Sequence, residues 1–336
     1  MRLRHVSRCR GELMSLDATI QRARSAREPL IRSEQSNAWR LFHGGSDGVE
    51  GLFIEQWADV LVAQFHPNHV HVREDETRGA LEHLRQSVNA RAVYRKIFPP
   101  DRAQVSPEIG AMHLSPQPWL GTPVEAEIPI VENSLKFLIR PYDGFSVGLF
   151  LENRDNRRRV RNMAAGRRVL NAFCYTCGFS VAAAAGGATS VYSVDLSRKY
   201  LEWGKRNFEA NRISTQGHWF FCSDVLDYYA RAKRQGRRFD LIILDPPTFA
   251  RMRRPRRTFV LEEDLGPLLA GAVELLDPGG ILLLATNCRQ LALARMEQEI
   301  RKAAGNRECT VLERPALPPD FPGDPDFAKS IIVRLN

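Results

Sequence analysis

The second half of the chain alternates short β-branched runs with longer amphipathic stretches, and this alternation limits the possible folds more than any other feature. The predicted strands are Arg168–Phe173, Ser190–Asp195, His218–Ser223, Asp240–Asp245, Gly280–Thr286, Cys309–Arg314 and Ser330–Leu335. The predicted helices are Asp195–Asn211, Val225–Gln235, Val260–Leu276 and Gln290–Ala304. Strands that alternate with helices predict a doubly wound α/β fold around a seven-stranded, mostly parallel sheet. In such a sheet the ligand binds at the carboxyl ends of the strands, where strand order switches.

The residues before Glu125 show a different sequence pattern. Residues 1–35 are polar and Arg-rich, and their apolar residues recur at helical spacing from Gly11 onwards, which predicts one amphipathic helix. Residues 36–123 carry short apolar runs between Gly and Pro, which predict a small α+β domain. Its expected elements are two paired strands and a helix, at Gly51–Gln56, Val60–Phe65 and Glu74–Ser87. The Pro-rich stretch 99–123 predicts an irregular connection to the third part, residues 124–336.

Composition indicates a folded chain that stays in the cytoplasm. Hydrophobic residues make up 43% and charged residues 26%, values typical of globular domains and far from those of disordered chains. The apolar runs are much shorter than the roughly 20 residues needed to cross a bilayer, and no secretory leader is evident. The six cysteines have no framework spacing, which indicates reduced thiols and predicts no disulfides.

The basic residues are mostly arginine. The formal net charge is +9, and only seven of the 48 basic residues are lysine. Guanidinium groups pair with phosphates in bidentate fashion and stack on bases, so this bias favours a nucleic-acid partner. An Arg-rich proteome would produce the same bias, and composition alone leaves both explanations open.

The first predicted strand of the α/β part runs into a glycine-containing turn. The sequence from Asn171 to Ser180 places Gly178 where a helix opens, so backbone N–H groups face a nucleotide-like ligand. The turn lacks the full G-x-G-x-x-G pattern that a pyrophosphate requires. S-adenosylmethionine has no phosphate, and this turn suits it better than a dinucleotide.

Acidic residues follow the next two strands. Asp195 stands at the distance after the glycine turn expected for a carboxylate that accepts hydrogen bonds from ribose hydroxyls. It is also a candidate N-cap for the following helix, and the two roles are compatible. Asp224 occupies the equivalent place after the third strand, where the adenine edge is expected.

The fourth strand ends in the most specific motif of the chain, Asp245-Pro246-Pro247-Thr248-Phe249. Two prolines make a rigid turn that presents the Asp245 carboxylate and the Pro246 carbonyl to the predicted cleft. Phe249 has the flat ring needed to stack on a base. A strand-ending turn would explain the prolines, but not their occurrence with the glycine turn and Asp195 at matching strand ends.

Together these motifs resemble a known family. The matching segments are Ser36–Phe42, Asp47–Phe53, Asp143–Gly144, Gly148–Arg157, Phe173–Ser180, Ser193–Ser197 and Asp245–Phe249. They are similar to the bacterial large-subunit ribosomal RNA methyltransferases of the cytosine carbon-5 and guanine type, class I S-adenosylmethionine-dependent enzymes. The resemblance covers about nine-tenths of the chain. It implies a Rossmann-like class I methyltransferase fold with a smaller N-terminal α+β domain, the cofactor S-adenosylmethionine and 23S-type rRNA as substrate.

The resemblance also implies roles for individual residues. The expected cofactor contacts are Phe150, Arg154, Asn171, Phe173, Tyr175, Thr176, Gly178, Asp195, Leu196, Asp224 and Asp245. Phe150 and Arg154 would flank the cofactor, and Asn171, Phe173 and Tyr175 would line its methionine end. Asp245, Pro246 and Phe249 would act on the acceptor.

The sequence departs from the family in two places. Only about 36 residues precede the central domain, so we expect the PUA RNA-binding module of the cytosine enzymes to be missing or vestigial. Cytosine carbon-5 methylation also requires a thiolate nucleophile, and the family's cysteine aligns with Asn287 rather than Cys288. Either Cys288 is the nucleophile, or a guanine nitrogen attacks directly and no thiolate is needed.

Other patterns leave further alternatives open. The Cys174-x-x-Cys177 pair would suit a redox site, but a thioredoxin-like chain is much shorter than this one. A zinc site would need a second pair of ligands at the usual spacing; the sequence has none, so no metal is expected. A catalytically idle, RNA-binding relative of the same fold also remains possible.

The arginines expected to contact RNA follow the Asp-Pro-Pro turn and are Arg251, Arg253, Arg254, Arg256 and Arg257. The oligomeric state, monomer or homodimer, is open.

Overall fold

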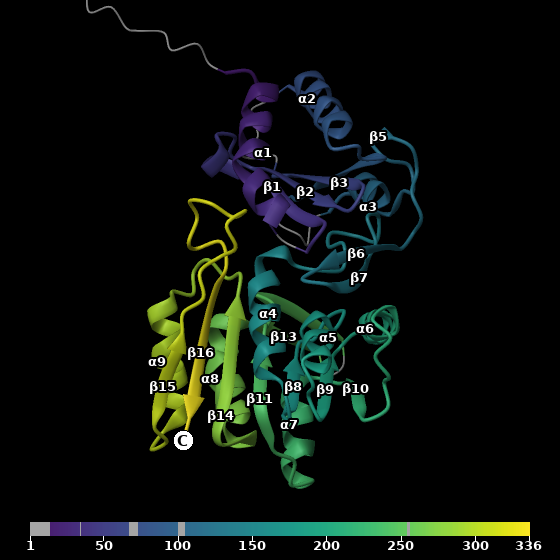
Figure 1. Cartoon of the computed structure of the whole chain (residues 1–336). Coiled ribbons are helices and arrows are strands. Elements are labelled where there is room, and N and C mark those ends of the chain that lie inside the picture. Colours follow the sequence, from purple (N-terminus) through teal and green to yellow (C-terminus); the bar gives the residue numbers. More distant parts are fainter. Residues whose placement is uncertain (1–13, 34, 67–72, 100–104, 254–255) are drawn as a thin grey trace, which may run out of the picture.

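A computed structural model of the chain describes residues 14–33, 35–66, 73–99, 105–253 and 256–336. Two units, each built around its own sheet, are stacked end to end (Figure 1). We call residues 16–121 the N-terminal unit and residues 154–336 the C-terminal unit. Among the residues described, no helix combines the length and apolar character needed to cross a bilayer.

The C-terminal unit is built on a seven-stranded sheet with the order β10-β9-β8-β11-β14-β16-β15. Its strands are β8 (Arg168–Ala172), β9 (Ser190–Asp195), β10 (His218–Cys222), β11 (Phe239–Leu244), β14 (Leu276–Thr286), β15 (Cys309–Glu313) and β16 (Lys329–Leu335). The first five strands in that order are parallel, and β16 runs antiparallel to both of its neighbours. The chain moves outward in opposite directions from β8 and β11, so the strand order switches between them.

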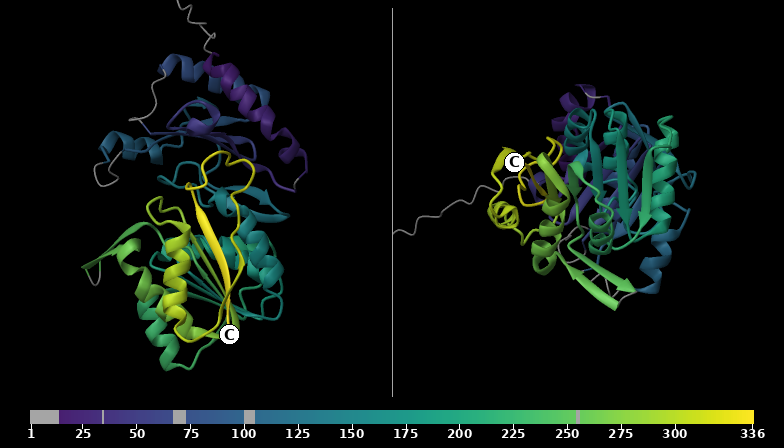
Figure 2. Two further views of the ribbon diagram at one scale, coloured as in Figure 1. Left: turned by 90° about the vertical axis from the view of Figure 1, so that its left-hand side faces the viewer. Right: turned by 90° about the horizontal axis from the view of Figure 1, so that it is seen from below.

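Helices cover both faces of this sheet, as the view from below shows (Figure 2). The helices are α4 (Arg154–Met163), α5 (Gly178–Ala185), α6 (Arg198–Ala210), α7 (Val225–Arg234), α8 (Leu261–Leu275) and α9 (Leu293–Ala304). The apolar residues of α7, α8 and α9 form a core with one face, whereas α4, α5 and α6 pack on the other. Because both faces are covered, Leu241–Leu244 is a fully buried apolar run, as expected of a central parallel strand.

All seven strands expected from the sequence are present, within a few residues of their predicted bounds. The N-cap of α6 is Ser197, whose hydroxyl accepts a hydrogen bond from the Tyr200 N–H, so Asp195 is not the cap. Part of the Arg-rich run 154–168 forms the helix α4. Residues after the Asp-Pro-Pro turn form a hairpin, β12 (Phe249–Arg253) and β13 (Arg256–Val260), that projects from the body (Figure 2).

The N-terminal unit contains a five-stranded sheet of order β1-β2-β3-β4-β5. Its elements are α1 (Leu16–Ser33), β1 (Ala38–His43), η1 (Gly44–Asp47), β2 (Leu52–Trp57), β3 (Val60–Phe65), α2 (Glu74–Ser87), β4 (Ala92–Ile97), α3 (Pro107–Leu114) and β5 (Leu120–Gly121). The predicted strand pair and the helix α2 are present. The stretch 99–123, expected to be irregular, contains α3 and β5, while residues 100–104 lie outside the described part.

The two faces of this smaller sheet have different partners. Helices α1 and α2 cover one face. The other face shares a core with the hairpin β6 (Ile128–Glu132) and β7 (Leu135–Ile139) and with residues of α5 and α6. The hydrophobic core therefore continues from one unit into the other and fixes their relative position.

A buried carboxylate ties the two units together. Asp320 accepts two hydrogen bonds from the Arg154 guanidinium, at 2.7 and 3.0 Å, and both side chains are fully buried. Asp320 Oδ2 also accepts the backbone N–H of Arg40 in β1, and its carbonyl accepts a hydrogen bond from Arg27 in α1. One residue of the C-terminal segment thus connects α4, β1 and α1.

We predict that Asp320→Ala lowers the free energy of unfolding by about 3–5 kcal/mol, because it leaves the Arg154 guanidinium buried without its carboxylate. Glu313→Ala is the matched control, since it breaks the Arg159–Glu313 pair, whose side chains are 26% and 44% exposed. That pair should contribute less than about 1 kcal/mol. Urea unfolding of both variants checks this, and equal losses would contradict it.

Candidate functional site

A cavity of about 1470 Å³ opens at the carboxyl ends of the parallel strands, where the C-terminal unit faces the N-terminal unit. Sites for small ligands usually occupy about 300–1,000 Å³. This cavity therefore has room for a cofactor and for part of a second substrate. Residues of both units line it, including Asp195 and Asp245 from the larger sheet and Glu55 and Gln64 from the smaller one.

The turn after β8 adopts an unusual backbone conformation beside the cavity. Phe173, Tyr175 and Cys177 all have positive φ angles, of 59°, 48° and 64°, which residues other than glycine rarely adopt. Hydrogen bonds hold the turn, since the Cys174 N–H donates to the Val194 carbonyl and the Tyr175 N–H to Asp195. Strained turns of this kind concentrate at binding sites, where the surrounding structure fixes them.

Asp195 links this turn to the end of β9. Its Oδ2 accepts the Tyr175 N–H at 2.9 Å, and its Oδ1 accepts the Ser197 N–H at 2.8 Å. Burial raises the pKa of Asp195 to about 6, although these two hydrogen bonds act in the opposite direction. The carboxylate is charged at neutral pH and faces the cavity, where it can accept further hydrogen bonds from hydroxyl groups.

Two more residues predicted to bind the cofactor lie next along the cavity wall. Asp224 caps α7, because its Oδ1 accepts the N–H groups of Leu226 and Asp227 at 2.8 and 3.2 Å. Leu196 lines the same wall and is 45% exposed. Asp224 therefore has a structural role in the helix as well as a place in the cavity.

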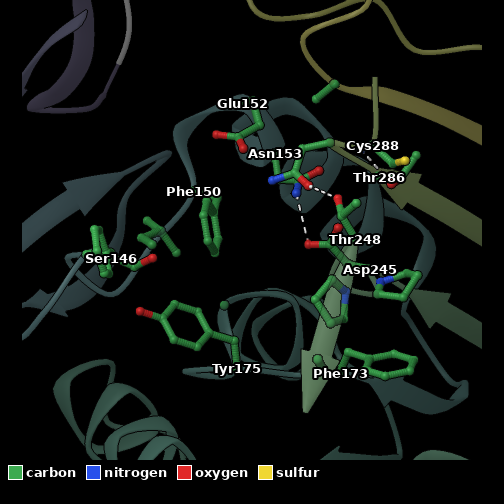
Figure 3. Close-up of a pocket in the computed structure, with 18 of the residues that line it drawn as sticks. Ser146, Phe150, Glu152, Asn153, Phe173, Tyr175, Asp245, Thr248, Thr286 and Cys288 are labelled. Carbon is green, nitrogen blue, oxygen red and sulfur yellow. Dashed lines mark hydrogen bonds between the residues drawn. The ribbon is translucent and has the colours of Figure 1, made fainter. Parts of the chain in front are cut away.

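Asp245 follows β11, across the strand-order switch from the turn after β8. Its Oδ2 accepts a hydrogen bond from Asn153 Nδ2 at 3.0 Å (Figure 3). Burial raises the pKa of Asp245 to about 6, and the nearby Arg157 guanidinium acts in the opposite direction. Pro246 lines the cavity beside it, and Phe249 stands at its rim with half of its surface exposed.

Two aromatic rings from different segments pack against each other in the cavity wall. Phe150 lies 5.6 Å from Tyr175, measured between ring centroids, and both line the wall. The segment before Phe150 bends at Gly148, whose φ is 119° and whose missing side chain makes room for Trp203. Thr176 donates a hydrogen bond to the Gly148 carbonyl at 2.5 Å and so connects the two segments.

The structure places Arg154 and Asn171 away from the cavity, contrary to the expectation that they bind the cofactor. The Arg154 guanidinium is directed at Asp320 and lies over the Trp39 ring, 4.9 Å from its centroid. Asn171 is buried, and its side chain donates a hydrogen bond to the Ser180 hydroxyl at 2.9 Å. It therefore supports the turn after β8 from the side away from the cavity.

Gly178 lines the cavity, where it was expected, and it also packs closely against a neighbouring segment. A Cβ atom at this position would lie 2.9 Å from Leu149 Cδ1 and 3.3 Å from Arg157 Cδ. The glycine is therefore needed for close packing of α5 against the neighbouring segment.

Cys288 lies in the cavity wall but is almost completely buried. Its Sγ is 3.6 Å from Gln290 Oε1 and 3.9 Å from Glu262 Oε1, so the thiol is surrounded by hydrogen-bond acceptors. Asn287 also lines the cavity, and its Oδ1 accepts a hydrogen bond from the Thr248 hydroxyl at 3.4 Å.

Four of the arginines expected to contact RNA, Arg251, Arg253, Arg256 and Arg257, belong to the strands of the β12–β13 hairpin, and their side chains lie outside the described part of the structure. Arg254 lies outside the described residues altogether. The hairpin itself begins at Phe249, at the cavity rim.

The cavity also contains residues that sequence reasoning did not single out. Glu152 and Asn153 lie within the motif Gly148–Arg157, which was recognised as a family feature without a role for either residue. The wall contributed by the N-terminal unit includes Arg40, Glu55, Gln64, His66 and Phe98. No local pattern marks this second group, because its members meet the cavity only through the packing of the two units.

The arrangement suits a cationic nucleoside ligand. Carboxylates of Asp195 and Asp245, aromatic rings and a strained turn share one cavity at the switch point. In the part of the chain that the structure describes, no group of three or more His, Cys, Asp or Glu side chains could hold a metal ion.

Comparison with known proteins agrees with this geometry. Residues 101–334 match the family model described as S-adenosylmethionine-dependent methyltransferase. A ribosomal RNA large subunit methyltransferase of Deinococcus radiodurans is 32% identical over 332 residues, covering 96% of this chain and 78% of the relative. Ribosomal RNA large subunit methyltransferase K of Neisseria meningitidis is 44% identical over 170 residues, covering 51% of this chain and 48% of the relative.

Solved structures lead to the same family. The crystal structure of SMU.776 in complex with SAH has a TM-score of 0.82 and 28% identity, covering 95% of this chain and 80% of that one. The fold and the cofactor inferred from the sequence are confirmed. The chain belongs to the S-adenosylmethionine-dependent methyltransferase family.

Proposed function

We propose that the protein transfers a methyl group from S-adenosylmethionine to a base of large-subunit ribosomal RNA. The observation that carries the proposal is the single cavity that holds both Asp195 and Asp245 and extends beyond them to the N-terminal unit. The relatives with matching sequences are named as large-subunit rRNA methyltransferases, which supports this substrate. An rRNA substrate also implies that the enzyme acts in the cytoplasm.

The cofactor would occupy the half of the cavity formed by the turn after β8. Its bound form supplies an electrophilic methyl group on a positively charged sulfur. Asp195 would accept hydrogen bonds from the ribose hydroxyls, and Asp224 and Leu196 would border the adenine. Phe173, Tyr175, Thr176 and Phe150 would enclose the remainder.

The acceptor base would lie against the Asp-Pro-Pro turn. The Asp245 carboxylate, held by Asn153, and the Pro246 carbonyl would orient the attacking atom, while Phe249 would stack on the base. Because the base must reach the bottom of a cavity, it would leave its stack before reacting. Because the Cys288 thiol is almost completely buried and lies against Gln290 and Glu262, we favour direct attack by a base nitrogen over the covalent cytosine mechanism.

RNA would approach across the junction of the two units. The net charge of +9 attracts a polyanion, and the arginines of the β12–β13 hairpin belong to a segment that starts at the cavity rim. His66, Phe98 and Phe145 line the far side of the cavity and provide rings on which flanking bases can stack. In this proposal residues 36–123 form an RNA-contacting domain and residues 124–336 the methyltransferase domain.

Asp245→Ala should lower kcat on unmodified large-subunit rRNA by at least about 100-fold, because it removes the group that orients the acceptor. Methyl transfer from radiolabelled S-adenosylmethionine to an rRNA transcript measures this. Asp240→Ala is a matched control at the other end of the same strand, where Asp240 pairs with Arg168. Full activity of the Asp245 variant would remove this carboxylate from the mechanism.

Cys288→Ser should keep kcat within about threefold of the wild type, because direct attack by nitrogen needs no thiolate. The same transfer assay, with mass spectrometry of the nucleosides, gives both the rate and the modified atom. Loss of activity together with 5-methylcytidine in the wild-type product would instead establish the covalent mechanism.

Cofactor affinity should fall at acidic pH because the pKa of Asp195 is about 6. Above that pH the carboxylate is charged and accepts ribose hydroxyl hydrogen bonds; below it, protonation weakens them. Calorimetric titration with S-adenosylhomocysteine should show affinity decreasing by up to about tenfold per pH unit below pH 6. Asp195→Asn should bind weakly and lose most of this dependence, and an unchanged profile in that variant would assign the titration to another group.

A further inference from the structure

Glu152 is a buried carboxyl group that the proposed reaction does not yet use. It belongs to η3 (Leu151–Asn153), the short turn that precedes α4, and only 9% of its surface is exposed. Its side chain lines the cavity (Figure 3). Its carboxylate accepts a hydrogen bond from its own backbone N–H, but among the described residues no other side chain forms a hydrogen bond with it. A buried carboxyl group without such partners requires an explanation, because desolvation of a charge is unfavourable unless a ligand compensates for it.

The charged groups around Glu152 leave its oxygen atoms available to a ligand. Arg40 is the main positive charge that acts on Glu152, but its Nη2 donates to Glu55 Oε1 at 2.7 Å. Glu55 also accepts hydrogen bonds from Trp57 and Gln64 through its other oxygen, Oε2. Burial raises the pKa of Glu152 to about 7, and the charges of Glu55 and Asp245 act in the same direction.

Glu152 also stands next to the group that orients the acceptor. Its neighbour Asn153 donates to Asp245, and the charge of Asp245 is close enough to affect the ionisation of Glu152. Figure 3 shows Glu152 and Asn153 at one end of the site and Phe173 and Tyr175 at the other, with Asp245 between them. A base held at Asp245 would therefore present an edge toward Glu152.

The chemistry of a carboxylate selects among base edges. Hydrogen bonds from two donors would favour the ionised form of Glu152, which only accepts hydrogen bonds and does so through two oxygens side by side. Guanine offers two adjacent donors on its Watson–Crick edge, the N1–H and the 2-amino group. Adenine and cytosine each offer one donor beside one acceptor, so their edges match an amide or a protonated acid. Flipped bases are commonly recognised on this edge.

We propose that Glu152 determines the base specificity of the enzyme by accepting hydrogen bonds from both Watson–Crick donors of an acceptor guanine. This inference rests on the proposed methylation of an RNA base. It assigns a separate task to each carboxylate: Asp245 orients the reacting atom, and Glu152 identifies the base. The hydrogen bonds from guanine would also compensate for the desolvation of Glu152.

The test is Glu152→Gln, which keeps the shape of the side chain but replaces one acceptor oxygen with a donor. Methyl transfer to unmodified large-subunit rRNA should show kcat/KM lowered by about 5- to 150-fold, the range expected for losing one bidentate base contact. Affinity for S-adenosylhomocysteine, measured by calorimetry, should stay within about twofold, since the cofactor half of the site is untouched. Glu313→Gln, an exposed carboxylate on β15, is the matched control and should behave as the wild type.

A second substrate separates recognition from a purely structural role. Once the modified guanosine is mapped, it is replaced by inosine, which lacks the 2-amino group, in a short RNA. The wild type should discriminate against inosine, and Glu152→Gln should lose most of that discrimination, as a coupled pair does in a double-mutant cycle.

Four outcomes would overturn the inference. Wild-type kcat/KM in Glu152→Gln, or equal discrimination against inosine in both proteins, would show that Glu152 does not contact the base. A methylated cytidine, adenosine or uridine as product would exclude a guanine acceptor while leaving RNA methylation intact. A wild-type protein that transfers no methyl group would refute the proposed function and this inference with it.

Discussion

The switch in strand order between β8 and β11 is the constraint on which the site depends. Parallel strands place all their carboxyl ends at one edge, and helices on both faces leave a crevice only where neighbouring connections diverge. The turns after β8 and β11 border that crevice from its two sides. Asp195 and Asp245 therefore share a cavity although 50 residues of sequence separate them.

The N-terminal unit turns this open crevice into an enclosed site. The shared core beneath the β6–β7 hairpin and the Asp320 hydrogen bonds hold the smaller sheet over the strand ends. The enclosure removes water from the carboxyl groups, which is why burial raises the pKa values of Asp195, Asp245 and Glu152. The same enclosure strengthens every electrostatic contact to a bound ligand.

Much of the α/β part could be predicted from the sequence, because its signals are local. The runs of apolar residues predicted the seven strands. The acidic residues that follow these strands lie in the cavity because parallel strands all end at the same edge of the sheet. The Asp245-Pro246-Pro247 motif and the turn before Gly178 were found for the same reason. Comparison with related proteins confirms the fold and the cofactor that these motifs imply.

What the sequence did not reveal depends on contacts between distant segments. Arg154 belongs to a family motif, but whether its guanidinium faces the cavity or a carboxylate 166 residues away is decided by tertiary packing. Asn171, in β8, likewise directs its side chain to the Ser180 hydroxyl and not into the cavity. The residues contributed by the smaller sheet, such as Glu55 and Gln64, have no local pattern that points to a cavity formed with another unit.

The distribution of charge separates the two binding tasks. The chain as a whole carries a formal charge of +9, whereas the cavity is lined by more carboxyl groups than guanidinium groups. The carboxyl groups are those of Glu55, Glu152, Asp195, Asp224 and Asp245, and the guanidinium groups are those of Arg40, Arg157 and Arg289. At physiological salt the field of surface charges is screened beyond roughly 8 Å, but contacts inside an enclosed site are screened much less. A polyanion is therefore attracted to the exterior by the net charge, while a cationic cofactor is favoured inside by the nearby carboxylates.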